Sequence, residues 1–443
     1  MRLGIDLLLS RRRFLSASAV CLAAGWARAD RLSDAGSVQP EDYGAVPDGV
    51  ADCTAALTAA IRSGRAVVLS AGSYRVTAPI VVRLKGGAFN LTGAGPGKSK
   101  IILDHFDAGL DIQGAPNSKL QVSLSRISVI RSRPDTYQGK PGPKAIYVAH
   151  ADQVDILDIE EAGGIGFGVQ VDQCSRYRIM GCYVHDHASG AVHRSGMDGI
   201  HVYRCPGPGV VSGNRIARVG DDAISFGSYQ AMLPTTDFIC RDNNVENVAG
   251  SIKMYGAVSR GLIENNVVKR GFNGGVTLWD DRDGDASHDI SFVIIRGNRL
   301  SHCGGPARAG GVYIAQTRGN GIQRMRDITV VDNDISDCRY GISMSSSVPT
   351  KGQARITIRE NRIRNSEQNG ILVSDIYEFA RIEENEIVQS GRDSVLLQTL
   401  NDSTISVVGN SLTRANGDRC GSISVPSTMP AERISITRNR LCA

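Results

Sequence analysis

The chain has 443 residues, of which 41% are hydrophobic and only 5% aromatic. Its formal net charge is +5, but residues 1–29 contribute +4 of this, and the remaining charge of about +1 argues against bulk electrostatic binding to nucleic acid or to an anionic membrane. Past the N-terminus no apolar run approaches the roughly 18 residues needed to span a bilayer, so we expect no membrane span. Two or three ordinary domains would fit this length, but a repeat architecture can absorb all of it.

Residues 1–29 have the features of a targeting segment. The arginines at 11–13 precede a mildly apolar, Ala/Ser-rich run, and Ala27-Arg28-Ala29 is a small-residue cleavage signal. The segment resembles a bacterial twin-arginine export signal; a short amphipathic helix is the alternative. We therefore expect a periplasmic or secreted protein that uses the twin-arginine export machinery. Its remaining cysteines form no C-x-x-C pair, and most of them are expected to pack as small core residues.

Residues 30–80 are expected to form an N-terminal cap and the first strands. A short helix is predicted from Ala55 to Arg62, with Thr54 as its N-cap and its end at Gly64. The first strands are predicted to begin at Val67. A solenoid has an exposed end that needs covering, and a helix at this place would cover it.

Residues 81–443 contain a repeat with a period of about 28 residues. Asn-x-aliphatic triplets recur, and after each one a small residue begins an alternating apolar run, as in Gly199-Ile200-His201-Val202-Tyr203. A strand that recurs once per coil stacks on its next copy in a parallel sheet, so the sequence predicts an all-β, single-stranded right-handed parallel β-helix. The asparagine is expected at a left-handed bend, bonded to the asparagine of the next coil. The triplets begin at Asn214, Asn243, Asn265, Asn298, Asn333, Asn361, Asn385, Asn410 and Asn439.

The N-terminal motif carries a family resemblance. The run from Asp42 to Thr54, which reads DYGAVPDGVADCT, leads into the predicted helix. This opening resembles that of the pectin-lyase-like superfamily, which includes polygalacturonases and phage tailspikes. The resemblance implies the β-helix fold and leaves the chemistry open.

Three aspartates fall on the frame of the predicted strands. Asp198 immediately precedes Gly199, and Asp222 immediately precedes Ala223, so the two occupy the same position on consecutive coils, with Asp221 beside them. Like carboxylates stacked at about 4.8 Å raise the pKa of one of them, as acid/base catalysis requires. The alternative is that these aspartates only cap bends by accepting backbone N–H bonds.

The outward positions of the same strands supply candidate substrate-binding residues. Aromatic rings beside carboxylates suit sugars, whose apolar faces stack while their hydroxyls form hydrogen bonds. Exposed strands also commonly carry Tyr and Trp without any such role. The candidates are His201, Lys253 and Tyr313 at the third strand position, and Asp172, Tyr203, Tyr255 and Trp279 at the fifth.

The segment Met197-Asp198-Gly199-Ile200 followed by Gly220-Asp221-Asp222-Ala223-Ile224 resembles the motifs of family 28 glycoside hydrolases, the polygalacturonase group. The resemblance implies Asp221 as general acid, with Asp198 and Asp222 holding the water of an inverting hydrolysis. Two motifs of that family are missing, because no His falls near Gly250 and no R-I-K near Leu278. Galacturonan is therefore not the expected substrate.

The first hypothesis is therefore a hydrolase of a poly- or oligosaccharide that needs no cofactor or metal. Two alternatives remain. A lyase or C5-epimerase would use Lys253 as base, with Ca²⁺ at the acidic run Asp280–Asp285. A non-catalytic glycan-binding or cell-surface protein would explain the missing basic motifs. The loop that carries His185, Asp186, His187 and His193 matches no standard metal spacing and indicates an exposed polar loop.

Overall fold

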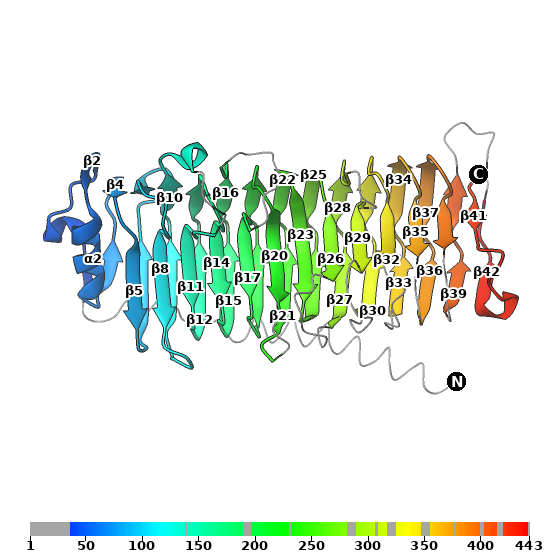
Figure 1. Ribbon diagram of the computed structural model, residues 1–443, viewed down its shortest axis with the longest axis horizontal. Coiled ribbons are helices and arrows are strands. Elements are labelled where there is room, and N and C mark those ends of the chain that lie inside the picture. The colour runs from blue at the N-terminus through cyan, green and yellow to red at the C-terminus, as the bar shows by residue number, and fades with distance from the viewer. Residues whose placement is uncertain are drawn as a thin grey trace.

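The chain winds around one long axis as a right-handed parallel β-helix (Figure 1). The candidate aspartates lie at strands near the middle of the solenoid, in the sheet that faces the viewer in Figure 1. The computed structural model describes residues 36–137, 140, 142–188, 196–229, 232–280, 289–305, 309–316, 325–346, 355–374, 378–398, 403–413 and 420–441. The predicted targeting segment, residues 1–29, lies outside these ranges.

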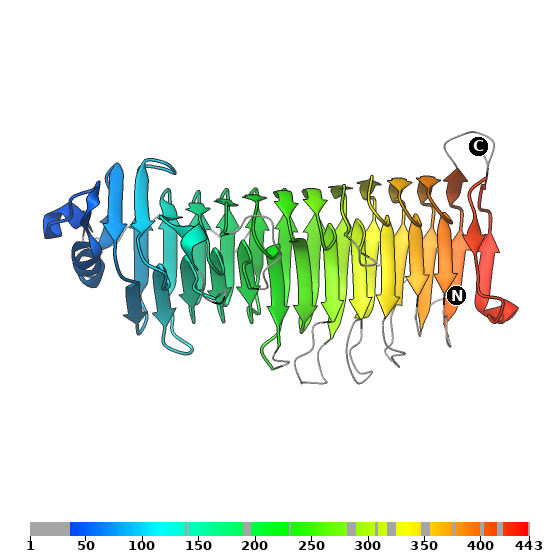
Figure 2. The same ribbon diagram turned by 45° about the horizontal axis from the view of Figure 1, so that its top comes forward.

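Three long sheets form the walls, and their strands pair in parallel with the strands one coil away (Figure 2). The sheet that carries the candidate site consists of β5 (Ile80–Leu84), β8 (Leu110–Gly114), β11 (Ile146–Ala149), β14 (Val169–Asp172), β17 (Ile200–Tyr203), β20 (Asp222–Ser228), β23 (Gly250–Gly256), β26 (Val276–Asp280), β29 (Val312–Gln316), β32 (Ile342–Ser346), β35 (Ile371–Ser374), β38 (Val395–Gln398) and β41 (Ile423–Ser424).

The other two walls are built in the same way, with inward Ile, Val and Leu filling one continuous core. One wall has β1 (Ser37–Val38), β3 (Ala66–Val68), β6 (Ala88–Thr92), β9 (Gln121–Ser125), β12 (Gln153–Leu157), β15 (Arg176–Met180), β18 (Gly209–Ser212), β21 (Thr235–Arg241), β24 (Val258–Glu264), β27 (Ile290–Arg296), β30 (Met325–Val331), β33 (Arg355–Arg359), β36 (Phe379–Glu383), β39 (Thr404–Val408) and β42 (Ile434–Thr437). The other has β2 (Asp48–Asp52), β4 (Gly72–Val76), β7 (Ser99–Leu103), β10 (Ser128–Arg131), β13 (Glu160–Ala162), β16 (Tyr183–His185), β19 (Arg215–Ala217), β22 (Asn244–Val248), β25 (Val267–Gly271), β28 (Arg299–Ser301), β31 (Asp334–Ser336), β34 (Arg362–Ser366), β37 (Glu386–Ser390) and β40 (Ser411–Thr413).

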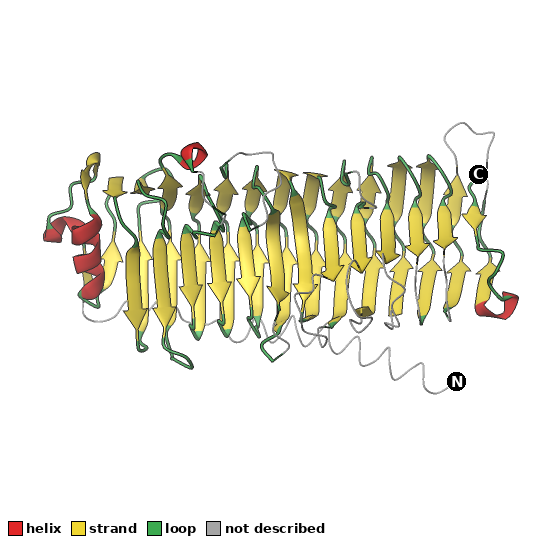
Figure 3. Cartoon of the chain, in the orientation of Figure 1, coloured by secondary structure: helices red, strands yellow, loops and turns green. Residues whose placement is uncertain are grey.

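The N-terminal end of the solenoid is covered by the α-helix α2 (Thr54–Arg62), drawn in red in Figure 3. The predicted helix is confirmed, but Thr54 is its first residue rather than its N-cap, which is Cys53. The Thr54 hydroxyl instead donates to Asp52, whose carboxylate also accepts the Thr54 backbone N–H. Strands also begin earlier than predicted, because β1 and β2 precede the helix and β1 pairs with β3.

Short 3-10 helices complete the elements, and none of the helices is a membrane-span candidate. These short helices are η1 (Pro40–Tyr43), η2 (Pro134–Thr136) and η3 (Ala431–Arg433). Within the described residues, no helix is long and apolar enough to cross a membrane. The cysteine prediction is confirmed for the free cysteines that the structure describes, since they are all buried, and it is wrong for Cys420, which is exposed and disulfide-bonded. The free cysteines are Cys53, Cys174, Cys182, Cys205, Cys240, Cys303 and Cys338.

A ladder of asparagines, all buried except the last, joins the coils of the C-terminal half of the chain. Each side-chain amide donates to the Oδ1 of the next asparagine at 2.9 Å, and the same Oδ1 also accepts a backbone N–H. The predicted ladder is therefore confirmed, with one correction: its third member is Asn266 rather than Asn265. The ladder runs through Asn214, Asn243, Asn266, Asn298, Asn333, Asn361, Asn385, Asn410 and Asn439.

The left-handed backbone was predicted at the ladder asparagine but lies one residue before it. Asn265, for example, has φ 55° and precedes Asn266, while Gly297 has φ 63° and precedes Asn298. The bend therefore occupies the preceding residue, which leaves the asparagine extended into the core, where its amide meets the next coil.

We expect Asn298→Ala to destabilise the fold by about 2 kcal/mol or more. The backbone N–H and the amide of Asn266 both donate to Asn298 Oδ1, and each buried donor left unpaired costs about 1–3 kcal/mol. Denaturant unfolding followed by circular dichroism measures the change. Asn244→Ala, at an exposed position of β22, is the control and should shift stability by less than about 0.5 kcal/mol. Equal effects of the two substitutions would contradict the role given to the ladder.

Candidate active site

Three aspartates converge on the outer face of two adjacent coils. Asp198 precedes β17 and Asp222 opens β20, and the pairing of Ile200 with Ile224 places these two carboxylates side by side, as predicted. One oxygen from each of Asp198, Asp221 and Asp222 lies within 4.8 Å of the others. Their exposed fractions are only 4%, 8% and 6%. The cluster is more compact than the separation of about 6.5–9.5 Å expected between the carboxyl groups of an inverting pair.

A glycine on the next coil makes room for this cluster. Gly250 pairs with Asp222 across the sheet, and a Cβ at Gly250 would lie 1.9 Å from Asp222 Oδ1. Any larger residue there would push the carboxylate away. The sequence lacks the His-containing polygalacturonase motif at this place. Gly250 occupies the position instead, and its lack of a side chain leaves room for Asp222.

Asp198 is held as an ionised carboxylate. Ser225 donates its hydroxyl to Asp198 Oδ2 at 2.6 Å, and His201 Nδ1 lies 3.1 Å from the same oxygen. Burial raises the pKa of Asp198, but the contacts with His201 and Ser225, together with the charge of Lys253, outweigh it and lower the pKa below its ordinary value. On its other side His201 Nε2 lies 2.8 Å from the Tyr255 hydroxyl, so the ring is fixed between two partners.

Asp221 has the opposite character. Burial, followed by the charges of Asp222 and Asp198, raises its pKa to about 9, although Gly196 donates its backbone N–H to Asp221 Oδ2 at 2.7 Å. The carboxyl of Asp221 therefore keeps its proton at neutral pH. Within one cluster, the pKa of Asp221 is raised and that of Asp198 is lowered. Such a separation is how acid and base roles can be divided between neighbouring groups.

Asp222 lies between these extremes and is paired with a cation. Lys253 Nζ lies 3.3 Å from Asp222 Oδ2. Burial raises the pKa of Asp222 to about 6, with Asp198 adding to the rise and Lys253 opposing it. In the structure Lys253 lies against the carboxylate cluster, where it balances negative charge, and its predicted contact with substrate stays a prediction.

The predicted substrate-binding columns are correct in register, since the third positions align through β17, β20, β23, β26 and β29, and so do the fifth. Their exposure differs. Tyr203 and Trp279 are partly exposed, whereas Tyr255 and Tyr313 are each only 5% exposed. Asp172 accepts hydrogen bonds from the Arg204 guanidinium and the Tyr147 hydroxyl and is 3% exposed, so the structure places it in a protein contact rather than in the groove.

Other neighbours were missed in the sequence. Ser225 stands at the same strand position as His201 and Lys253, so the repeat frame itself could have identified it. Phe167 packs edge-on against His201 with ring centroids 4.6 Å apart, and Tyr229 lies 5.0 Å from Tyr255. Phe167 and Tyr229 flank their strands, where the alternating pattern gives no signal.

Among the described residues, the three aspartates are the one group with an arrangement that could hold a metal ion. Carboxylate oxygens suit a hard cation such as Mg²⁺ or Ca²⁺, but Lys253 already contributes positive charge here. The acidic run at 280–285, expected to be a Ca²⁺ loop if the protein is a lyase, lies almost wholly within 281–288, outside the described residues, and stays a prediction.

The histidine loop differs from its prediction. His193 lies outside the described residues. Asp186 is exposed, as expected for a loop, but its partner His185 is the last residue of β16 and its side chain is only 13% exposed. His187, however, is fully buried and pairs with Glu161 at 2.9 Å. The sequence spacing gave no sign of this, because Glu161 lies a full coil earlier in the chain.

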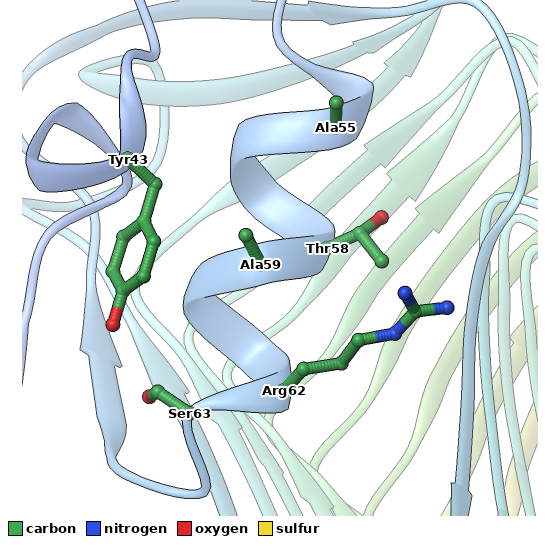
Figure 4. Close-up of a pocket in the computed structure, with 6 residues that line it drawn as sticks. All are labelled: Tyr43, Ala55, Thr58, Ala59, Arg62 and Ser63. Carbon is green, nitrogen blue, oxygen red and sulfur yellow. The ribbon is translucent and has the colours of Figure 1, made fainter.

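A pocket of about 540 Å³ lies at the N-terminal cap, remote from the aspartates in the chain (Figure 4). Its lining includes one charged side chain, Arg62, and no carboxylate. It lacks an acid/base pair, so the candidate active site is the aspartate cluster. The lining residues are Tyr43, Ala55, Thr58, Ala59, Arg62 and Ser63.

The solved structures that resemble this chain share its fold at low sequence identity. The catalytic unit of a GH87 α-1,3-glucanase from Streptomyces thermodiastaticus is 17% identical, with 93% of this chain and 70% of that one covered and a TM-score of 0.54. The A-module of a mannuronan C-5 epimerase from Azotobacter vinelandii is 18% identical, with 87% and 100% covered and a TM-score of 0.53. The Dettilon tailspike protein is 17% identical, with 81% and 66% covered and a TM-score of 0.57.

Family models match two parts of the sequence. Residues 275–441 match the model described as periplasmic copper-binding protein (NosD). No curated relative matches the chain by sequence. The model described as rhamnogalacturonase A/epimerase, pectate lyase-like, matches residues 37–275, which is more than half of the chain and includes all three aspartates. The chain therefore belongs to the rhamnogalacturonase A/epimerase, pectate lyase-like family.

Proposed function

We propose that the chain is a glycoside hydrolase of a poly- or oligosaccharide, with the aspartate cluster as its catalytic centre. The observation that carries this proposal is the separation of acid and base within the cluster. The pKa of Asp221 is raised to about 9, chiefly by burial, while contacts with His201 and Ser225 hold that of Asp198 below its ordinary value. A hydrolase needs one protonated and one ionised carboxyl group at the same bond.

In the proposed reaction, Asp221 donates its proton to the glycosidic oxygen as the C–O bond breaks. Asp198 accepts a proton from the water that attacks the anomeric carbon, so the two fragments together gain one water molecule. His201 and Ser225 orient the Asp198 carboxylate, and Lys253 offsets the charge of Asp222. Tyr203 and Trp279, which are partly exposed on adjoining coils, would stack against sugar rings.

The contacts of the site weigh against the two alternatives. A lyase or epimerase with Lys253 as base would need a free amine, whereas Lys253 lies in an ion pair with Asp222. A non-catalytic protein would be favoured if the aspartates served as caps of backbone turns. Asp198 contacts side chains instead, and the three carboxylates face one another.

Copper binding is not part of this proposal. The NosD match covers residues 275–441, and within the described part of that segment no cluster of three His, Cys, Asp or Glu ligands is assembled. The word periplasmic in that family's description supports our proposal that the chain is exported to the periplasm or beyond. We propose the twin-arginine machinery from residues 1–29 of the sequence alone.

Asp221→Asn should lower kcat on the cognate glycan by about 10²- to 10⁴-fold, since general acid catalysis contributes that much. Release of reducing ends from a panel of acidic and neutral glycans, with absorbance of unsaturated products read in parallel, identifies the substrate and measures the loss. Asp242→Asn, at an exposed bend, is the matched control and should be fully active. Unsaturated products, or an undiminished rate in Asp221→Asn, would contradict the proposal.

The same substitution should stabilise the protein in alkaline solution. Burial and the charges of Asp222 and Asp198 raise the pKa of Asp221 from 3.8 to about 9. Between these pH values the folded protein keeps this proton and the unfolded chain loses it, so the wild type becomes less stable as the pH rises. The melting temperature of Asp221→Asn minus that of the wild type should therefore grow with pH across this window and then level off. A difference independent of pH would show that Asp221 is already ionised in the folded protein.

The configuration of the first product tests the role of water. Attack by a water held at Asp198 predicts inversion at the anomeric carbon, which proton NMR of the fresh product detects before mutarotation. The compact spacing of the carboxylates makes retention the competing outcome. Retention would mean that one of the ionised aspartates attacks the sugar directly.

A further inference from the structure

A buried pair of side chains, Glu161 and His187, lies beside the backbone that carries the aspartate cluster. Glu161 of β13 aligns with Val129 of β10 and Val184 of β16, which are core positions. His187 Nε2 lies 2.9 Å from Glu161 Oε2, and both side chains have no exposed surface. Glu161 therefore occupies a position that the repeat otherwise fills with an apolar residue.

Such a pair is costly to bury. Removing two charges from water costs several kcal/mol per ion, and well-packed apolar residues of similar size are often equally or more stabilising. Among the residues that the structure describes, the other oxygen of Glu161, Oε1, has no hydrogen-bond partner. The charge of Glu161 also acts on buried Arg131, opposing the fall in the pKa of that guanidinium that burial causes. The pair is thus poorly explained as a contribution to stability.

Its contacts lie on both sides of Asp198. His187 Nδ1 lies 3.3 Å from the carbonyl oxygen of Met197, and the same oxygen accepts the backbone N–H of Asp221 at 3.2 Å. Glu161 Oε2 lies against Gly168, where a Cβ would approach it to 2.5 Å, and the Gly168 N–H donates to the Asp198 carbonyl at 2.9 Å. The pair therefore touches the peptide that precedes Asp198 and the residue bonded to its carbonyl.

The imidazole acts as a bridge between two acceptors. The atoms facing Nε2 and Nδ1 are a carboxylate oxygen and a carbonyl oxygen, so both hydrogen bonds form when both ring nitrogens carry a proton. A glycine at 164 lets the ring lie there, since a Cβ would come within 2.7 Å of His187 Nε2. The imidazole thus connects Glu161, in the core of one coil, to the carbonyl of Met197, which precedes Asp198 and accepts the backbone N–H of Asp221.

We infer that Glu161 and His187 are positioning residues that fix the spacing between Asp198 and Asp221. This inference rests on the proposed hydrolase function. The Met197 carbonyl is the shared point, because it bonds to the core pair from one coil and to Asp221 from the next. Repulsion between carboxylates depends on their distance, so a shift of this peptide would change how firmly Asp221 holds its proton.

The test replaces the pair by apolar residues that suit the core column. In Glu161→Val/His187→Leu we expect a melting temperature at or above that of the wild type, because the buried charges are gone. We expect kcat on the cognate glycan to fall about 100-fold with little change in KM, as for an active-site displacement of about 1 Å. The matched control, Glu160→Val/His185→Leu, removes the neighbouring pair near the surface and should keep wild-type kcat.

A second readout needs no substrate. The infrared band of protonated carboxylic acid groups, assigned by its loss in Asp221→Asn, gives the titration midpoint of Asp221 directly. We expect a lower midpoint in Glu161→Val/His187→Leu than in the wild type or the control. If the wild type cleaves no glycan, the proposed hydrolase fails, and a shifted midpoint still supports the positioning role.

The inference is overturned if the double variant folds with wild-type kcat and an unchanged midpoint. Should it fail to fold, Glu161→Gln/His187→Gln replaces it, because a Gln amide carries both donors on one nitrogen and cannot bridge acceptors on opposite sides. Glu161→Gln alone keeps the His187 bridge and should restore most of the activity. Equal loss in this conservative variant would indicate a structural role only.

Discussion

The parallel stacking of each coil on the next in a fixed register is the constraint on which this structure depends. Strands in a sheet lie about 4.8 Å apart, so a residue at a given place on one coil meets the residue at the same place on its neighbours. For apolar residues this produces the continuous core, and for asparagine it produces a ladder in which every amide has its acceptor. The register of the stacked strands thus determines which side chains meet, whatever the chemistry of those side chains.

The same constraint makes the aspartate cluster chemically unusual. Asp198 and Asp222 occupy one column, and Asp221 is adjacent, so three carboxylates share a space that burial has largely closed to water. The fold relieves the repulsion unequally: His201 and Ser225 support Asp198, Lys253 supports Asp222, and Asp221 keeps its proton, its pKa raised by burial and by the other two aspartates. The acid and base roles that we propose therefore depend on the neighbours that the strand columns supply.

The inside of the solenoid contributes to the site as well as the outside. Glu161 breaks the apolar column of its wall, and its partner His187 reaches the carbonyl of Met197. Residues on three successive coils therefore act on one stretch of backbone. A solenoid is built from local contacts between neighbouring coils, and the candidate site follows that rule in its supporting residues too.

The sequence by itself determined the β-helix, the capping helix, the strand columns and the pairing of Asp198 with Asp222, because all of these follow from periodicity along the chain. It could not determine which of two adjacent asparagines enters the ladder, since the choice between Asn265 and Asn266 depends on where the left-handed bend falls. Tertiary structure alone decided that Arg204 engages Asp172 and that Glu161 buries His187. Those contacts join side chains about one coil apart, and their direction and burial depend on how neighbouring coils pack, which a repeat pattern does not encode.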